Sequence, residues 1–276
     1  ISLSTLLLYL IPASYILILG QLISQIFDIN LILAIFLGAT FSTAYTLKGG
    51  FTSILKTDQI QFIFMFFGFI TLFCSLFFSD SYGPSIIKDL YNRQPDLFSI
   101  PGRAPLSYIV MFAFLSLLTF LDPSFHQRTF AGKNLKTVQK SITISALCWF
   151  VFDLITITTA LFYIEIAFRN GFDIYSTSSP YIELAKIVFN NNPFLMGLFF
   201  ISILSVVMST IDSFIFITGF TIGKDLFEVL SQKNSTTTHV RIGIIVSGLF
   251  SMILASFFTH AVDIWYFTGS LAVPSL

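Results

Sequence analysis

The residues best suited to chemistry lie within one long apolar stretch, which runs from Asn192 to Glu228. The stretch is long enough to cross a bilayer, which takes about 20 residues. Its middle nevertheless carries four hydroxyl side chains and one carboxylate: Ser205, Ser209, Thr210, Asp212 and Ser213. Because Ser209 and Ser213 are one helical turn apart, they share a face of the helix, with Asp212 beside them.

An ionised aspartate in mid-membrane costs roughly 2.5–3.5 kcal/mol, so Asp212 requires a compensating partner. Hydroxyl and carboxylate oxygens are hard donors, which an alkali cation prefers. Alternatively, the hydroxyls bond back to the carbonyls one turn earlier, and Asp212 caps a buried hydrogen-bond network. These residues alone leave both interpretations open.

The composition is that of a membrane protein. Of the 276 residues, 55% are hydrophobic and only 10% are charged, and the mean hydropathy is +0.87. A soluble domain carries about 25% charged residues. The net charge of zero gives no indication of a nucleic-acid partner. Cys74 and Cys148 each lie inside an apolar run, and we expect buried thiols rather than a disulfide.

The apolar segments predict an all-α integral membrane protein. Seven complete membrane helices and part of an eighth are expected, at about residues 3–27, 31–47, 57–78, 105–121, 143–168, 192–228, 242–258 and from 261. Short surface helices are expected near residues 86–91 and 180–189. The start at Ile1 and the apolar last segment predict an internal fragment of a longer chain.

Two local sequences predict breaks in these helices. Lys48-Gly49-Gly50 separates the second helix from the third, because glycine permits a turn with positive φ. Asp122-Pro123 interrupts the fourth helix, because proline disfavours the α conformation of the residue before it. Discontinuous membrane helices of this kind hold substrate and ions in many transporters.

Basic residues predict the orientation, since Lys and Arg favour the cytoplasmic side. If the first helix leaves the cytoplasm, the inner loops hold Lys48, Lys56, Arg128, Lys133, Lys136, Lys140, Lys224, Lys233 and Arg241. The outer loops then hold only Lys88, Arg93, Arg103, Arg169 and Lys186. Asp58 comes near the cytoplasmic end of its helix and can meet the inner half of the 192–228 helix. A carboxylate with two or three hydroxyls forms a cage of low charge, which suits a monovalent cation better than a divalent one.

Three motifs carry a resemblance to a known family. They are TAYTLKGGFTSILKTDQIQ from Thr43 to Gln61, FHQRTFAGK from Phe125 to Lys133, and MSTIDS followed by GKDLF between Met208 and Phe227. In order and position they resemble the signatures of the sodium:solute symporter family. The resemblance implies a LeuT-like fold with a five-plus-five inverted repeat of core helices. Residues 1–276 would then be part of a single transmembrane transporter domain, with core helices three to nine and part of the tenth.

The resemblance also implies two sodium sites. The first uses the Val206 carbonyl with the hydroxyls of Ser209 and Thr210. A second site, present in some members, matches Asp58, Ser209 and Ser213. Asp212 stands where some members have serine, so it either adds charge to the second site or faces elsewhere.

The chain around the predicted break at Pro123 offers residues for a solute. Asp122, Ser124, Phe125 and His126 could bind substrate there, with Phe125 as an apolar gate. Alternatively, Asp122 caps the broken helix, and His126 is an interfacial histidine.

Other polar residues in the helices have structural interpretations. Asp153 is expected to pair with a helix neighbour or with threonine side chains. Glu165 and Asp263 lie near helix ends, where water can solvate them. Gln21 either bonds across the bundle or lines the pathway.

The expected function is sodium-coupled symport of a small organic solute by alternating access, with Na⁺ as the coupling ion. The partners are the solute, sodium ions and the lipid bilayer, in a bacterial inner membrane. A proton-coupled symporter of the same fold and a membrane input module of a sensor are the alternatives. No enzyme is expected, because His126, His239 and His260 are scattered and no HExxH or GxSxG pattern occurs. The sequence does not indicate which solute is carried.

Overall fold

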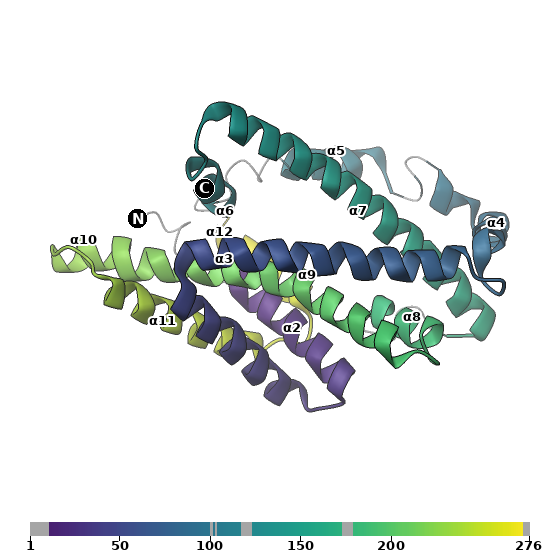
Figure 1. Cartoon of the computed structure of the whole chain (residues 1–276), viewed down its shortest axis with the longest axis horizontal. Helices are drawn as coiled ribbons and strands as arrows, with labels where there is room; N and C mark the ends of the chain where they lie inside the picture. The colour runs from purple at the N-terminus through teal and green to yellow at the C-terminus, as the bar shows by residue number, and fades with distance from the viewer. Residues whose placement is uncertain (1–10, 100–101, 103, 117–122, 173–178, 273–276) are drawn as a thin grey trace. The chain divides into compact units, whose positions relative to one another are not determined.

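The computed structural model describes residues 11–99, 102, 104–116, 123–172 and 179–272. These residues form helices, turns and bends, and no strand occurs among them, as the predicted all-α class requires. The chain divides into two compact units, one of Ile1–Met65 with Phe200–Leu276 and the other of Phe66–Phe199. Figure 1 labels the helices of both units.

Four helices in the described part of the chain are long and apolar enough to cross a membrane: Leu31–Phe77, Leu135–Asn170, Pro193–Ser231 and Thr237–Ala255. Large apolar side chains on these helices are exposed, among them Phe62, Ile63, Leu147, Phe150 and Ile253. Each of these side chains is less stable by about 1.5–3 kcal/mol in water than in an apolar medium. The chain is therefore an integral, multi-pass membrane protein.

Helix α3 (Leu31–Phe77) contains the predicted glycine break. Gly50 has φ 60° and ψ −169°, a backbone conformation that is open essentially to glycine alone. The next helical segment begins at Phe51 and not near Thr57 as predicted, because residues 51–56 hold no proline or further glycine. At 1.5 Å per residue α3 is about 70 Å long, more than twice the thickness of the hydrocarbon core, so it comprises two crossing segments.

The first unit contains the first segment of α3 and most of α9 (Pro193–Phe220). Its other elements are α2 (Ile11–Phe27), the π-helix η4 (Thr221–Leu226), α10 (Phe227–Ser231), α11 (Thr237–Ala255) and α12 (Ala261–Ala272). Helix α2 packs against both α11 and α12. Trp265 of α12 donates from Nε1 to Ser14 Oγ of α2 at 2.8 Å. The next residue of α2, Tyr15, stacks on Phe214 of α9 with ring centroids 5.6 Å apart, so α2 joins these helices.

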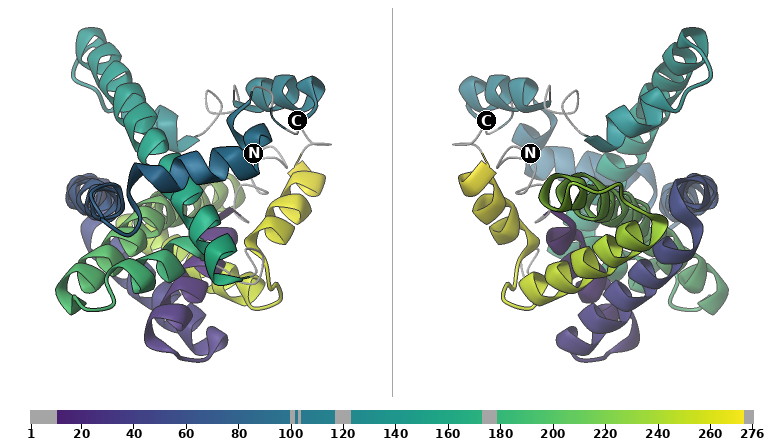
Figure 2. Two further views of the ribbon diagram at one scale, coloured as in Figure 1. Left: turned by 90° about the vertical axis from the view of Figure 1, so that its right-hand side faces the viewer. Right: turned by 90° about the vertical axis from the view of Figure 1, so that its left-hand side faces the viewer.

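The π-helix η4 and α11 approach each other closely. In the right view of Figure 2, α11 runs back along the end of the α9–η4 helix after a short loop. A Cβ atom on Gly243 would lie 2.1 Å from the Gly219 carbonyl oxygen, and one on Gly223 would lie 2.2 Å from the His239 carbonyl oxygen. The two backbones therefore touch at positions that admit no side chain.

The second unit is built around α7, and its elements are α4 (Gly83–Arg93), η2 (Pro95–Phe98), α5 (Leu106–Ser116), α6 (Pro123–Phe130), α7 (Leu135–Asn170) and α8 (Pro180–Val188). Helix α7 contacts α4 and α8. Phe69 of α3 lies at the centre of an aromatic cluster, with ring centroids 5.1 Å from Phe152, 5.4 Å from Tyr181 and 5.3 Å from Phe199. Aromatic packing thus joins α3, α7, α8 and the first turns of α9.

The predicted surface helices near residues 86–91 and 180–189 are confirmed as α4 and α8. Helix α7 begins well before the predicted residue 143, because the Asn134 side chain accepts a hydrogen bond from the Thr137 N–H at 2.9 Å and caps it. The helix α6 starts at Pro123, a residue favoured at the first helical position. Cys74 and Cys148 are free, as expected, but both are half-buried rather than buried.

Candidate ion-binding site

The hydroxyls in the middle of α9 bond back to their own helix. Ser209 Oγ and Thr210 Oγ1 both donate to the Val206 carbonyl oxygen, at 3.1 and 3.4 Å. Ser213 Oγ donates to the Ser209 carbonyl oxygen at 3.1 Å. The predicted back-bonding is therefore confirmed. Each hydroxyl oxygen retains lone pairs after it donates its proton, so back-bonding leaves it able to bind a cation.

Asp212 lies among these hydroxyls and is fully buried, with 0% of its surface exposed. Neither of its carboxylate oxygens has a hydrogen-bond partner in the described part of the chain. The prediction that Asp212 caps a buried hydrogen-bond network is therefore wrong. A buried carboxylate without partners must either take up a proton or attract a cation, since burial of an isolated charge is costly.

Ring contacts join α3 and α9 within each unit. In the first unit the rings of Phe51 and Phe216 stack with centroids 6.1 Å apart, and in the second unit Phe69 contacts Phe199 at 5.3 Å. The contact between Phe51 and Phe216 lies in the same unit as Asp58 and Ser209.

The same contacts indicate which faces meet. Asp58 follows Phe51 by seven residues and Ser209 precedes Phe216 by seven, so each lies on the same helix face as its phenylalanine. Asp212 lies one turn from Phe216 on that face. The predicted group of Asp58, Ser209 and Asp212 is therefore brought to facing stripes of α3 and α9. Asp58 is half-buried there.

Gln61 was not predicted as part of this group. It lies one turn after Asp58 on α3. Its Oε1 atom is buried and has no hydrogen-bond partner among the described residues. Two sequence signals could have identified it: Gln61 follows Asp58 by three residues, and it ends the motif that starts at Thr43.

These groups together offer hard oxygen donors, most of which are uncharged. They are two carboxylates, two or three hydroxyls, an amide oxygen and the Val206 carbonyl. Within the described residues no group of three or more His, Cys, Asp or Glu side chains could hold a metal ion. The donor set therefore suits a monovalent cation rather than a transition metal or a calcium ion.

The residues predicted to bind substrate belong to the second unit. Asp122 lies outside the described residues. Ser124 and Phe125 are half-buried in α6, whereas His126 is exposed and stacks on Phe130 with centroids 5.8 Å apart. These three side chains thus lie on one short helix of the second unit, whereas the ion group belongs to the first unit.

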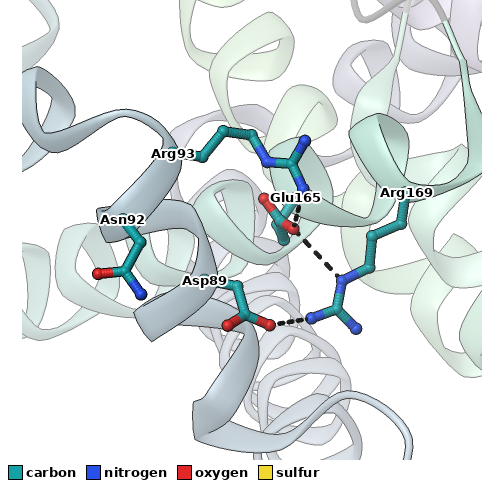
Figure 3. Close-up of a pocket in the computed structure, with 5 residues that line it drawn as sticks. All are labelled: Asp89, Asn92, Arg93, Glu165 and Arg169. Atoms are coloured by element: carbon teal, nitrogen blue, oxygen red, sulfur yellow. Dashed lines mark hydrogen bonds and ion pairs between the residues drawn. The ribbon is translucent and has the colours of Figure 1, made fainter.

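A pocket of about 360 Å³ lies at the other end of α7, lined by Asp89, Asn92, Arg93, Glu165 and Arg169. Figure 3 shows Glu165 between the two guanidinium groups. Arg93 Nη2 and Arg169 Nε each donate to Glu165 Oε1 at 3.3 Å, and Arg169 also pairs with Asp89. The prediction that water solvates Glu165 is wrong, because the side chain is fully buried under these arginines. Asp263 is exposed, as predicted, and Gln21 bonds across the bundle, with Nε2 donating to the Thr259 carbonyl oxygen at 2.7 Å.

A sequence model of the Sodium:solute symporter family matches residues 1–266, which is nearly the whole chain. The chain belongs to this family. It is a family of transporters rather than of enzymes.

Curated relatives agree with the family match. The "Sodium/proline symporter" of Haemophilus influenzae is 30% identical over 229 residues, which are 79% of this chain and 44% of the relative. The "High-affinity proline transporter PutP" of Bacillus subtilis is 26% identical over 77% of this chain and 45% of the relative. The "Sodium/proline symporter" of Escherichia coli is 25% identical over 86% and 48%. The chain thus spans less than half the length of these relatives.

Proposed function

We propose that the protein carries out sodium-coupled symport of a small organic solute. The observation that carries the proposal is Asp212, a fully buried carboxylate without a hydrogen-bond partner among the described residues, on the helix that also carries the hydroxyls of Ser209 and Thr210. A cation bound there would compensate the buried charge. Membership of the sodium:solute symporter family supports sodium as that cation.

The proposed mechanism divides the oxygens between two sodium ions. The Val206 carbonyl and the hydroxyls of Ser209 and Thr210 would hold one ion. Asp58 and the hydroxyls of Ser209 and Ser213 would hold a second ion, and Asp212 would add negative charge to that site. Each ion that crosses a membrane potential of 100 mV supplies about 2.3 kcal/mol, to which its concentration gradient adds.

The proposed fold is the five-plus-five inverted repeat, in which residues 1–276 are part of one transporter domain. The break at Gly50 agrees with a transporter built from interrupted helices. Bacterial relatives support a place in the inner membrane of a bacterium.

For the solute we propose proline or a similar small zwitterion, because relatives with 22–30% identity are named proline transporters. Asp122, Ser124, Phe125 and His126 are the proposed contacts. Phe125 would supply an apolar surface for a pyrrolidine ring, and the polar groups beside it would bind the charged ends.

A proton-coupled symporter is the second candidate, and Asp212 favours it as well, because a protonated carboxyl also removes the buried charge. A membrane input module of a sensor would use the same helices without net transport. Uptake into proteoliposomes that contain the full-length protein separates the three. Labelled proline, pantothenate, sialic acid, acetate and sugars would each be offered with an inward sodium gradient and with a proton gradient alone.

Accumulation of proline driven by sodium would support the proposal, and accumulation driven by protons alone would favour the second candidate. No accumulation of any solute would favour the sensor module. Ser209→Ala and Thr210→Ala should each raise the half-saturating sodium concentration about tenfold, which corresponds to about 1.4 kcal/mol. Ser205→Ala is the control, since Ser205 bonds back to the Ile201 carbonyl at 2.8 Å in the same helix but lies outside the proposed site.

A further inference from the structure

The turn between α6 and α7 carries an excess of positive charge. Residues 123–152 contain Arg128, Lys133, Lys136 and Lys140 and no aspartate or glutamate. All three lysines are exposed, and none forms an ion pair in the described part of the chain. We call the segment from Arg128 to Lys140 the basic turn. Its charge is not used by the proposed ion or solute sites.

The lysines oppose the dipole of the helix that they begin. Helix α7 starts at Leu135, and Lys136 and Lys140 lie in its first two turns, which contain no acidic residue. The N-terminus of a helix carries a partial positive charge, so cations there are unfavourable by about 0.3–1 kcal/mol each. An anion beside the turn would offset both the lysines and the dipole.

The basic turn also lies where the apolar part of α7 begins. Helix α7 has 36 residues and is apolar enough to cross a membrane. Its length of about 54 Å exceeds the hydrocarbon core of about 30 Å, so one end must extend beyond it. The apolar run starts at Ile142, and beyond it Trp149 and Phe150 are exposed to the surroundings of the helix. The lysines are therefore positioned at the edge of the membrane.

Exposed apolar side chains accompany these lysines. Phe130 is 83% exposed and Leu135 is 72% exposed, and both lie within the basic turn. Such a mixture is typical of the interface, where apolar side chains enter the lipid and lysines remain at the level of the headgroups.

We propose that the basic turn binds the headgroups of anionic phospholipids in the leaflet that it faces. Lys136 and Lys140 are one turn apart, so they project from the same face of α7 and can contact one phosphate together. Lys133 adds a third cation from the turn itself. The site anchors α7 at the membrane surface and makes the protein sensitive to the anionic lipid content of its membrane.

Lipid binding by the detergent-solubilised full-length protein tests this proposal. Native mass spectrometry would compare phosphatidylglycerol with phosphatidylcholine of the same acyl chains. The wild type should retain phosphatidylglycerol preferentially. Lys136→Gln with Lys140→Gln should lower its affinity at least about fivefold, the effect of about one lysine near an anionic surface. Lys136→Arg with Lys140→Arg keeps the charge and should keep the affinity.

Lys88→Gln with Lys186→Gln is the matched control, since both lysines are exposed and lie outside the basic turn. The control should leave the preference for phosphatidylglycerol unchanged. If the control variant loses this preference, net charge alone explains it and the proposal is overturned. Equal binding of both lipids by the wild type, or full binding by the glutamine double variant, would do the same. Displacement by millimolar glycerol phosphate would assign the site to a soluble phosphate instead of a membrane. If the double glutamine variant does not fold, Lys136→Gln and Lys140→Gln tested singly should each lose part of the preference.

Discussion

Replacing Asp212 by asparagine separates its two possible effects, because the change removes the charge and nearly preserves the shape. The carboxylate of Asp212 is fully buried and has no hydrogen-bond partner among the residues that the structure describes. An ionised aspartate at the centre of a membrane helix costs roughly 2.5–3.5 kcal/mol. In the absence of sodium, Asp212→Asn should therefore stabilise the protein.

The same change should weaken sodium binding. Opposite unit charges 4 Å apart attract by about 4 kcal/mol at an effective dielectric constant of 20. Because the asparagine amide oxygen still offers a partial negative charge, we expect a loss of about half this value. A loss of about 2 kcal/mol corresponds to roughly thirtyfold in sodium affinity.

Two assays check this pair of opposite effects. Thermal unfolding in sodium-free choline buffer should show a rise of at least about 2 °C, given about 2–4 °C per kcal/mol for a protein of this size. Uptake in proteoliposomes should show a half-saturating sodium concentration roughly thirtyfold higher. Asp263→Asn is the control, because Asp263 is exposed and should change neither quantity. A variant with unchanged sodium dependence and no gain in stability would refute the place of Asp212 in the ion site.

Three further substitutions test local packing and backbone geometry in the helices. Glu165→Gln leaves the two arginines beside it without their shared carboxylate, so it should lower the melting temperature by several degrees. Glu183→Gln is the control, because Glu183 forms an exposed pair with Lys186 at 3.7 Å and its loss should change the melting temperature little. Gly243→Ala brings a Cβ atom to 2.1 Å from backbone and should destabilise the protein by at least about 1–3 kcal/mol, whereas Gly197→Ala meets nothing within 4 Å and should be neutral or slightly stabilising. Gly50→Ala also meets no atom within 4 Å, so it should lower the free energy of unfolding by about 1–3 kcal/mol through the backbone conformation alone. An unchanged free energy of unfolding in chemical denaturation would contradict this account.

Features set by neighbouring residues could be predicted from the sequence. The break at Gly50 follows from local sterics, and the surface helices α4 and α8 follow from proline and from short amphipathic patterns. The group on α9 could be predicted because a polar cluster in an apolar helix is conspicuous. The early start of α7 was missed, since the polar segment after Gly132 reads as a loop unless the cap at Asn134 is recognised.

Features set by distant residues could not be predicted. Glu165 lies one turn from the end of α7 and would be solvated there if α4 did not bring Arg93, 72 residues earlier, over it. Gln21 reaches the Thr259 carbonyl, 238 residues away, and no local pattern indicates that choice. The contact of Phe51 with Phe216, 165 residues later, likewise depends on how α3 and α9 pack within the first unit.

The α9 hydroxyls can both bond back to their own helix and bind a cation, so the two interpretations are compatible. Ser209 and Thr210 each give their proton to the Val206 carbonyl, which satisfies the hydroxyls when no ion is present. The donated proton also fixes each oxygen, so that its lone pairs point away from Val206. The Val206 carbonyl could then join an ion only if one donor turned aside. Thr210, whose bond of 3.4 Å is longer than the 3.1 Å bond of Ser209, would release it first. In the proposed site, a bound cation would therefore replace one of these weak internal hydrogen bonds. When no ion is bound, the hydroxyl protons of Ser209 and Thr210 are both satisfied.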